Sequence, residues 1–434
     1  MVIEASTGQR DARRVFVYFA PLTLLIYLAL PNGYGLDIAL TFILKDYLRA
    51  TPEQVANFRL LMAIPLYFAF CFGFARDLWN PLGLRDRGFL IVFGTCAAAV
   101  FLVLAWSPLT YGGLLAGILL IMVCFAFVSS AFQGLIALIG QERLMSGRLA
   151  ALWNILSNTP YAIGAFVAGY VAEHLSPRGT FLLAAALCVL IALYGLLKPR
   201  AVFSHTYDQP AARGTTLLGD IRRLVRHRAI YPAILIIFMF QFSPGSNTPL
   251  QFQLTDVLHA SDSAYANFQG LFSLGFLPAY ALYGYLCRRV PLRKLLWLGT
   301  LITVPQMMPL AFIHSAGQAL WLAPLMGLMG GIAYSAFIDL AMRSCPPGLQ
   351  GTLMMATAGA YELAWRGGDL LGAWIYARSP LHGFLYCALA TTAVYALILP
   401  VLLLIPTEVV ATADGEPNAV AEAEMLEEIG EAVA

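Results

Sequence analysis

The sequence predicts an all-α membrane protein with twelve transmembrane helices, arranged as two six-helix bundles that repeat in the same orientation. Three observations support this prediction. Hydrophobic residues make up 60% of the 434 residues and charged residues only 12%, about half the charged share of a soluble domain. The apolar residues gather in runs long enough to cross a bilayer. Short segments of the first half recur in the second half at a nearly constant spacing.

The composition also excludes several classes of protein. So few charged residues cannot cover a soluble globular protein, and they are not the composition of a disordered chain. The net charge of +2 gives no basic excess for binding nucleic acid. The seven cysteines are scattered without a CxxC pair, which favours apolar packing over disulfides or a metal site. No catalytic or ATP-binding motif occurs, so we expect neither an enzyme nor a cofactor.

Twelve apolar runs set the predicted helices. The first 14 residues are polar, and the run that follows is too long for a signal-peptide core, so we predict an uncleaved first helix. In chain order, the runs are 15–43, 55–76, 88–106, 111–139, 149–174, 179–198, 229–255, 264–287, 291–313, 318–343, 350–377 and 382–405.

The basic residues alternate between the loops. If the N-terminus is cytoplasmic, 20 of the 26 lysines and arginines lie on the inside and four on the outside, and Arg59 and Arg366 lie within helices. Cytoplasmic loops carry such an excess. We therefore predict an integral multi-pass protein of a bacterial inner membrane, with both termini in the cytoplasm.

The two halves of the chain resemble each other. Leu48–Phe58 and Leu258–Phe268 share leucine, two alanines, asparagine and phenylalanine at an offset of 210, and Ser176–Phe181 matches Ser379–Phe384 at 203. Two matches at nearly one offset indicate a duplicated six-helix unit. The predicted parts are an N-terminal bundle over 1–198, a cytoplasmic linker over 199–228, a C-terminal bundle over 229–405 and an acidic cytoplasmic tail over 406–434.

The loop after the second run carries a family resemblance. Gly73 and Asp77 are followed by Gly83 and then by Arg85 and Arg87. This pattern is similar to the loop between the second and third helices of major facilitator transporters. The resemblance implies a parallel repeat with a transport site between the halves near the membrane midplane.

Three shorter stretches resemble the folate–biopterin branch of that superfamily. They are Thr41–Leu48, Thr51–Pro52 with Pro65, and Ser243–Thr248. The resemblance to this branch implies proton-driven transport of pteridine-like or other organic solutes. It assigns no substrate-binding residue to this sequence.

Charges near the membrane surface suggest a gate. We expect Asp77 to pair with Arg85 and Arg87 as a cytoplasmic latch that breaks when the halves rock. The alternative is that these charges only orient the chain in the membrane.

Six charged side chains lie in the interior of the predicted helices rather than at their ends, and each costs roughly 2.5–3.5 kcal/mol near the bilayer centre unless it is paired or hydrated. Asp339 precedes Arg343 by four residues, which predicts an ion pair at a helix end. Asp37 and Arg59 lie at similar depths on neighbouring helices, so we expect a second pair. The six are Asp37, Arg59, Asp339, Glu362, Arg366 and Asp369.

The last three of these can share one helix face. Glu362, Arg366 and Asp369 are spaced by four and three residues. One interpretation is a structural triad that satisfies itself. The other is functional: Glu362 or Asp37 carries the coupling proton, and Arg366 binds an anionic group of the substrate.

Two helices are interrupted at matching places. Pro31–Gly35 and Ser243–Pro249 combine proline with glycine, so both helices should bend. Matching interruptions point to a transport site, although a packing kink is the alternative. Gly327, Gly330 and Gly331 favour close helix packing. The uncharged candidates for the substrate pathway are Tyr34, Gln133, Asn158, Gln241, Asn247, Gln251 and Tyr334.

Together these features predict a secondary active transporter. We expect a monomer in the lipid bilayer that moves a small polar organic solute by alternating access, in symport with protons. An efflux carrier for amphipathic compounds is the alternative within carriers. A membrane receptor or channel without carrier activity is the alternative from another class.

Overall fold

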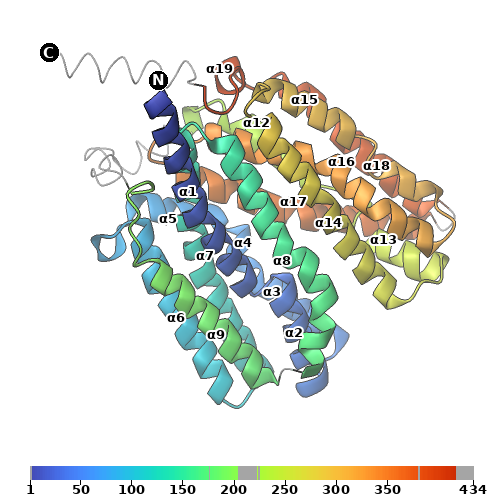
Figure 1. Cartoon of the computed structure of the whole chain (residues 1–434). Coiled ribbons are helices and arrows are strands. Elements are labelled where there is room, and N and C mark those ends of the chain that lie inside the picture. Colours follow the sequence, from blue (N-terminus) through green and yellow to red (C-terminus); the bar gives the residue numbers. More distant parts are fainter. Residues whose placement is uncertain (1, 175, 204–221, 223–224, 380–381, 417–434) are drawn as a thin grey trace. The chain divides into compact units, whose positions relative to one another are not determined.

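The computed structural model describes residues 2–174, 176–203, 222, 225–379 and 382–416. Every regular element in these ranges is helical, and none of them contains a strand (Figure 1). Each of the twelve predicted apolar runs contains helix. The predicted linker and acidic tail lie partly outside the described residues, and the boundaries of the two predicted bundles stay a prediction.

The first half of the chain contains long helices and several short ones. Thr51 begins one helix with a capping box, since its hydroxyl accepts from Gln54 N–H and the Gln54 side chain accepts from Thr51 N–H. The elements are α1 (Val2–Ala29), α2 (Tyr34–Phe42), the π-helix η1 (Ile43–Tyr47), α3 (Pro52–Met62), α4 (Ile64–Tyr67), α5 (Ala69–Leu78), the 3-10 helix η2 (Pro81–Gly83), α6 (Asp86–Trp106), α7 (Tyr111–Glu142), α8 (Ser146–His174) and α9 (Pro177–Tyr194).

The second half repeats this mixture of long and interrupted helices. The elements are α12 (Ile230–Gln241), α13 (Thr248–Phe252), the π-helix η3 (Gln253–Val257), α14 (Asp262–Leu286), α15 (Leu292–Thr303), the 3-10 helix η4 (Met308–Phe312), α16 (Ala316–Arg343), α17 (Gln350–Arg378), α18 (Gly383–Leu402) and α19 (Thr407–Val410).

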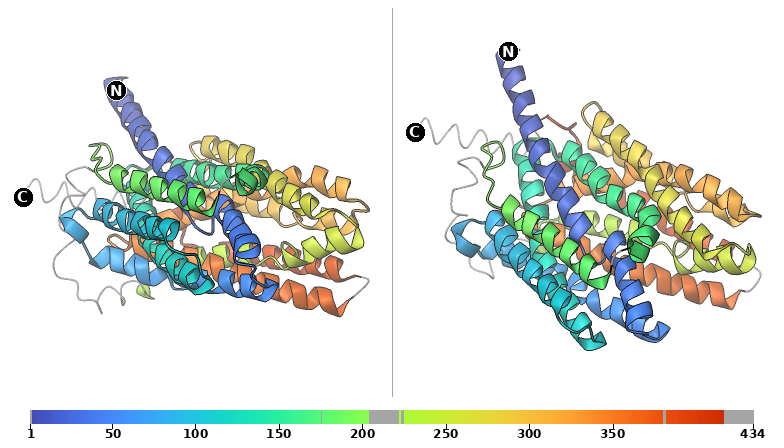
Figure 2. Two further views of the ribbon diagram at one scale, coloured as in Figure 1. Left: turned by 90° about the horizontal axis from the view of Figure 1, so that it is seen from below. Right: turned by 60° about the horizontal axis from the view of Figure 1, so that its bottom comes forward.

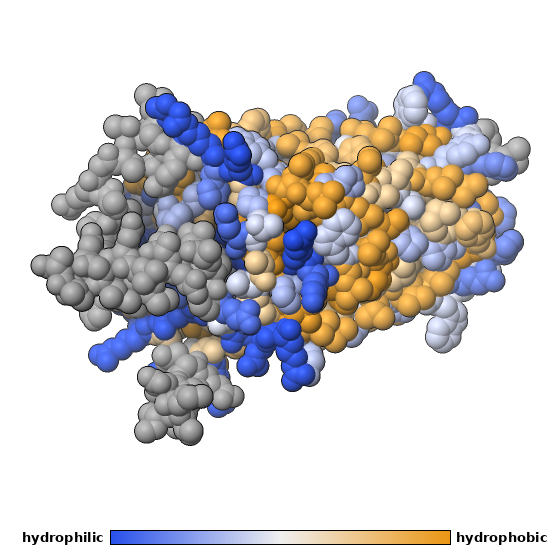
Figure 3. Space-filling view, turned by 90° about the horizontal axis from the view of Figure 1, so that it is seen from above, coloured by the Kyte–Doolittle hydropathy of each residue, from blue (hydrophilic) through white to orange (hydrophobic). Residues whose placement is uncertain are grey.

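Seven spans among the described helices are long and apolar enough to cross a membrane by length and composition alone. The remaining predicted spans are interrupted, as in α3 to α5, or carry more polar side chains, as in α17. Apolar side chains cover much of the face shown in Figure 3. Trp321 is 85% exposed and Leu370 is 74% exposed, as suits side chains that face lipid rather than water.

The described chain divides into two compact units. The first comprises Met1–Ile136, Leu156–Leu217 and Gly348–Gly359. Within it, α6 and α9 run side by side in Figures 1 and 2, and α1 packs against α9. The fully buried Phe101 and Phe181 stack across the α6–α9 contact with ring centroids 6.3 Å apart.

The second unit comprises Ala137–Ile155, Leu218–Pro347 and Ala360–Ala434. Within it, α14 and α16 lie side by side (Figures 1 and 2). A Cβ at Gly327 would stand 2.1 Å from the carbonyl oxygen of Phe272, and one at Gly331 would stand 2.4 Å from the Cβ of Ala279. These distances confirm that the glycines of α16 permit close helix packing.

Candidate functional site

Both predicted helix interruptions are present. α1 ends at Ala29 and α2 begins at Tyr34, while α12 ends at Gln241 and α13 begins at Thr248. The bends predicted from proline and glycine are therefore confirmed, one in each half of the chain.

A π-helix follows each interruption, at the repeat spacing of 210 residues. η1 covers Ile43–Tyr47 and η3 covers Gln253–Val257. Just after them, Arg49 and His259 both adopt a left-handed backbone, with φ of 50° and 51°. Such a conformation is uncommon for residues other than glycine, so its recurrence at the same offset shows that the two segments are copies in structure as well as in sequence. π-Helical turns occur frequently at functional sites.

In the first unit, the predicted pair of Asp37 and Arg59 is confirmed. Arg59 Nη2 lies 2.9 Å from Asp37 Oδ2, and it also donates to Thr41 Oγ1 at 2.9 Å. The hydroxyl of Thr41 in turn donates to the Asp37 carbonyl oxygen at 2.7 Å. The charge of Asp37 is thus matched by a cation from the neighbouring helix.

In the second unit, the middle of α17 packs against the interruption between α12 and α13. Asp369 Oδ1 accepts from Thr248 N–H at 2.8 Å, and Asp369 Oδ2 accepts from the Thr248 hydroxyl at 3.0 Å. A Cβ at Gly372 would stand 1.9 Å from the carbonyl oxygen of Pro244, and one at Gly368 would stand 2.8 Å from the backbone nitrogen of Ser243. Glycine is therefore required where α17 meets the broken backbone.

Arg366 lies on α17 three residues before Asp369, yet it does not pair with that acid. Its guanidinium carbon lies 4.6 Å from the ring centroid of Trp365, a cation–π contact. Its Nε is buried and has no hydrogen-bond partner among the described residues. The ion pairs found within the described chain also leave out Glu362, which is half-buried one turn earlier on α17. The interpretation of these three side chains as a self-satisfied triad is wrong for Asp369, which is engaged by Thr248. Glu362 and Arg366 still interact through their charges, although they form no ion pair.

The uncharged candidates divide between the two units. Gln133 on α7 is buried and Asn158 on α8 is half-buried, while Gln251 on α13 is exposed. Asn247 directly precedes α13, and Tyr334 on α16 stacks on Phe240 with ring centroids 5.5 Å apart. The side chain of Tyr34 lies outside the described side chains, and the half-buried Gln241 ends α12 at the interruption.

The last turn of α5 forms ion pairs other than the predicted ones. Asp77 pairs with Arg76 at 2.8 Å, and Arg76 also pairs with Asp86. Asp77 further accepts from the backbone N–H and the hydroxyl of Thr352, at 2.7 and 2.6 Å. The carboxylate thus binds the first turn of α17, where the helix dipole favours an anion.

The two arginines expected in the latch lie elsewhere. Arg87 donates to the carbonyl oxygens of Gly195 and Leu196 at 2.9 Å. Arg85 precedes α6 with a φ of 50°, and its backbone N–H donates to the Asn80 side chain. Their predicted pairing with Asp77 is therefore corrected to a pairing of Asp77 with Arg76, because Arg76 directly precedes Asp77 in α5 and Arg87 is held by the carbonyl oxygens of Gly195 and Leu196.

Sequence reasoning missed Arg76, Thr248 and Thr352 as partners of acidic side chains. Arg76 directly precedes Asp77, which was an available signal. Nothing in the spacing of the two threonines marked them, because both contacts join segments more than 100 residues apart.

Residues 16–368 match the Major Facilitator Superfamily. The chain belongs to the major facilitator superfamily. It is 24% identical over 364 residues to the folate-biopterin transporter of Synechocystis sp., covering 78% of this chain and 71% of that protein. It is 21% identical over 334 residues to folate transporter 2 of Plasmodium falciparum, covering 73% and 71%.

Solved structures of major facilitator proteins share its fold. The transporter FucP in the outward conformation aligns with a TM-score of 0.68 at 15% identity, over 90% of this chain and 98% of that one. The proton:xylose symporter XylE gives a TM-score of 0.69 at 13% identity, over 94% and 98%. The human organic anion transporter MFSD10 gives 0.65 at 16%, over 90% and 99%. This major facilitator protein is therefore an integral multi-pass membrane transporter, and its family is not one of enzymes.

Proposed function

We propose that this protein is a proton-coupled symporter for a small organic anion of the pteridine or folate class, working by alternating access. The single observation that carries the proposal is the environment of Arg366. Its guanidinium stacks on Trp365, and its buried Nε has no hydrogen-bond partner in the described part of the chain. Glu362, one turn earlier on α17, is the acid whose charge interacts with this cation, but it forms no hydrogen bond with the Nε, so a substrate carboxylate would supply the missing acceptor.

The chemistry of this position suits a folate-like ligand. A guanidinium binds a carboxylate through paired, charge-assisted hydrogen bonds. The interruption before α13 lies against α17 within two turns of Arg366, as the contacts of Gly368 and Gly372 show. Interrupted helices supply free backbone groups for binding a solute. The similarity to a folate-biopterin transporter and a folate transporter supports the same substrate class.

Glu362 is the residue we propose for proton coupling. It is half-buried on α17, one turn before Arg366, and has no ion pair within the described residues. Asp37, the other candidate, is neutralised by Arg59 at 2.9 Å. The cation that neighbours Glu362 is Arg366, which acts on it without forming an ion pair, and a carboxylate held by no ion pair can accept and release a proton as its surroundings change. XylE, which shares the fold, is a proton:xylose symporter.

We place both termini in the cytoplasm on the basis of the loop charges, and propose a monomer in a bacterial inner membrane. Counterflow in proteoliposomes tests the proposed function. Vesicles loaded with unlabelled folic acid should take up labelled folic acid from outside, and pterin-6-carboxylate should compete. Absence of counterflow with both compounds, in vesicles whose protein is shown to be folded, would overturn the substrate class.

A further inference from the structure

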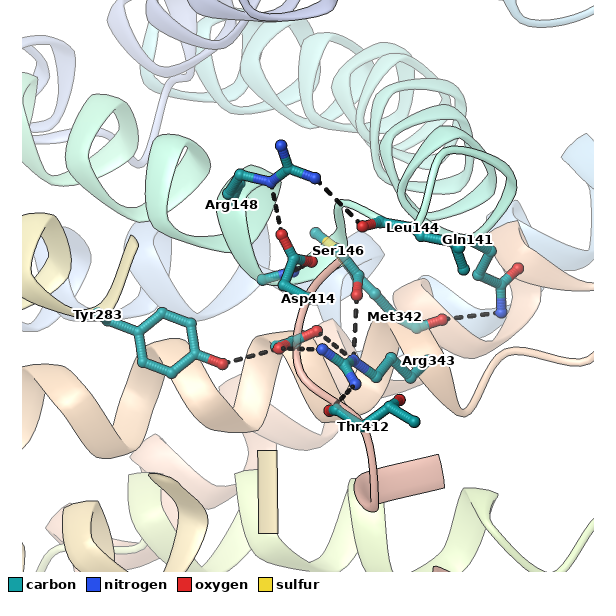
Figure 4. A network of polar contacts seen from close by, with 11 residues as sticks. Gln141, Leu144, Ser146, Arg148, Tyr283, Met342, Arg343, Thr412 and Asp414 are labelled. Atoms are coloured by element: carbon teal, nitrogen blue, oxygen red, sulfur yellow. Dashed lines mark hydrogen bonds and ion pairs between the residues drawn. The ribbon is translucent and has the colours of Figure 1, made fainter. Parts of the chain in front are cut away.

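The chain ends, as far as it is described, in a segment that folds back onto the helices. Val410, Ala413 and Asp414 are all buried, although this segment follows the last long helix and carries the start of the acidic tail. Gly415 has a φ of 97°, a backbone conformation that side chains other than glycine rarely adopt. The resulting turn directs the carboxylate of Asp414 inward (Figure 4).

Asp414 binds the first turn of α8. Its Oδ1 accepts from Gly147 N–H at 2.9 Å, and its Oδ2 pairs with Arg148 Nε at 2.5 Å. The carboxylate is fully buried, whereas the Arg148 side chain is 21% exposed. The backbone N–H of Asp414 donates to the carbonyl oxygen of Cys287, just after α14, at 2.8 Å. One residue of the C-terminal segment thus joins α8 to the end of α14.

Thr412 joins the same segment to two further helices. Its carbonyl oxygen accepts from Arg343 Nη1 at 3.0 Å and from Leu292 N–H, at the start of α15, at 3.4 Å. Arg343 pairs with Asp339 at 2.9 Å, which confirms the predicted pair, and Asp339 accepts from the Tyr283 hydroxyl at 2.8 Å. Both acids and both arginines of this network therefore have partners (Figure 4).

The start of α8 also contacts α14 and α16 directly. Arg343 donates to the Ser146 hydroxyl at 3.2 Å, and Asn154 donates to the Ser335 hydroxyl at 3.1 Å. A Cβ at Gly284 would stand 3.1 Å from the Cβ of Ala151. By sequence, α8 belongs to the first predicted repeat, but residues 137–155 group with the second compact unit.

We propose that Val410–Glu416 is a strap that holds the end of α8 against α14 and α16, and that its detachment frees α8 to move away from them during transport. Three features support a releasable strap. Its attachment consists of a few polar contacts and the two small buried side chains of Val410 and Ala413. Its anchor Asp414 requires the turn at Gly415, and its ion pair with Arg148 is partly open to solvent. The contacts it spans join helices assigned to different repeats, which alternating access moves relative to one another.

Disulfide formation between α8 and α14 tests the strap. In the full chain with its seven native cysteines replaced, Ala151→Cys and Gly284→Cys place two Cβ atoms near the separation of about 3.5–4.5 Å that a disulfide needs. The rate of oxidant-induced crosslinking is followed by counting free thiols with a maleimide polymer. Asp414→Ala should lower this rate at least 5-fold. Glu408→Ala, an exposed acid on α19, is the matched control and should leave the rate unchanged.

A second variant protects the test against misfolding. Gly415→Val removes no charge and lies at an exposed position, but it disfavours the turn that directs Asp414 inward. It should slow crosslinking in the same direction as Asp414→Ala. If both variants crosslink at the rate of Glu408→Ala, the strap does not hold α8 and the inference is overturned.

A transport measurement tests whether α8 must move away from α14 for transport to occur. Crosslinked protein should lose folic acid counterflow and regain it after reduction with dithiothreitol. This arm rests on the proposed function, whereas the crosslinking rate requires no substrate. A protein whose crosslinking depends on the strap but which never transports folic acid would contradict the substrate class and leave the strap supported. Transport that persists after complete crosslinking would overturn the role of strap release.

Discussion

Asp369 accepts two hydrogen bonds from Thr248, one from its backbone N–H at 2.8 Å and one from its hydroxyl at 3.0 Å. The carboxylate therefore fixes the start of α13 to α17 instead of neutralising Arg366 one turn earlier. This arrangement separates a structural acid, Asp369, from Arg366, whose Nε has no hydrogen-bond partner within the described residues.

Replacing Asp369 should destabilise the protein. Asp369→Ala leaves the Thr248 N–H and hydroxyl without their acceptor, so we expect a loss of about 1–3 kcal/mol, seen as a lower Tm in detergent. Thr248→Val removes only the hydroxyl bond and should cost less. Thr255→Val is the matched control, because its hydroxyl bonds the Gln251 carbonyl within the same exposed turn. Equal Tm values for Asp369→Ala and wild type would contradict the structural role of this acid.

Replacing Arg366 should weaken binding of anions selectively. Loss of a charge-assisted bond costs about 1.5–3 kcal/mol, or roughly 10- to 150-fold in Kd. Arg366→Gln should reduce the affinity for folic acid by that factor and change the affinity for uncharged pterin little, as measured by titration of the purified protein. Arg378→Gln is the control, because Arg378 also stacks on a tryptophan of α17, Trp374, but is exposed. Unchanged folic acid affinity in Arg366→Gln would rule out the carboxylate contact.

Close packing of α14 and α16 predicts a position-dependent effect of alanine. Gly327→Ala places a methyl group 2.1 Å from the Phe272 carbonyl oxygen, so the helices must separate, at about 1–3 kcal/mol. Gly317→Ala, on the same helix, places its Cβ 4.0 Å from Ser315 Oγ, an ordinary contact, and should be neutral or slightly stabilising. Comparable Tm values for the two variants would show that the close contact is not a constraint.

The strap should depend on pH. Burial raises the pKa of Asp414, and the nearby charge of Asp339 raises it further. An acid whose pKa is raised by folding stabilises the folded form most fully below its ordinary pKa of about 3.9, and this contribution is lost as pH rises through the raised value. After correction for intrinsic rates, hydrogen exchange at Val410–Glu416 should therefore be slower at pH 5 than at pH 8. Asp414→Asn should abolish the difference, and a wild-type strap with equal protection at both pH values would contradict the assignment.

Much of the fold could be predicted because the apolar runs and the repeated segments can be recognised from the residues alone. Proline and glycine indicated both interrupted helices. The spacing of four residues was enough to predict the ion pair between Asp339 and Arg343. The similar predicted depths of Asp37 and Arg59 in the membrane were enough to predict their ion pair, since both lie near the same end of neighbouring helices.

The remaining contacts depend on backbone conformation that sequence patterns do not determine. Three arginines lie within ten residues of Asp77, and Asp77 pairs with Arg76, on its own side of the turn through Pro81–Gly83. The sequence alone does not determine which arginine forms the pair. Asp414 is one of several acids in the predicted acidic cytoplasmic tail. Only the turn at Gly415 and the proximity of Arg148 distinguish it, and these follow from folding over long sequence separations.

Proton-driven accumulation of folic acid by Glu362→Gln tests the central claim most directly. In proteoliposomes with an inward proton gradient, wild type and the exposed-acid control Glu408→Gln should concentrate labelled folic acid above equilibrium. Glu362→Gln should lose this accumulation and keep counterflow, because exchange of substrate requires no net proton movement. Accumulation by Glu362→Gln at the wild-type level would contradict Glu362 as the proton carrier and, with it, the coupling mechanism proposed for this transporter.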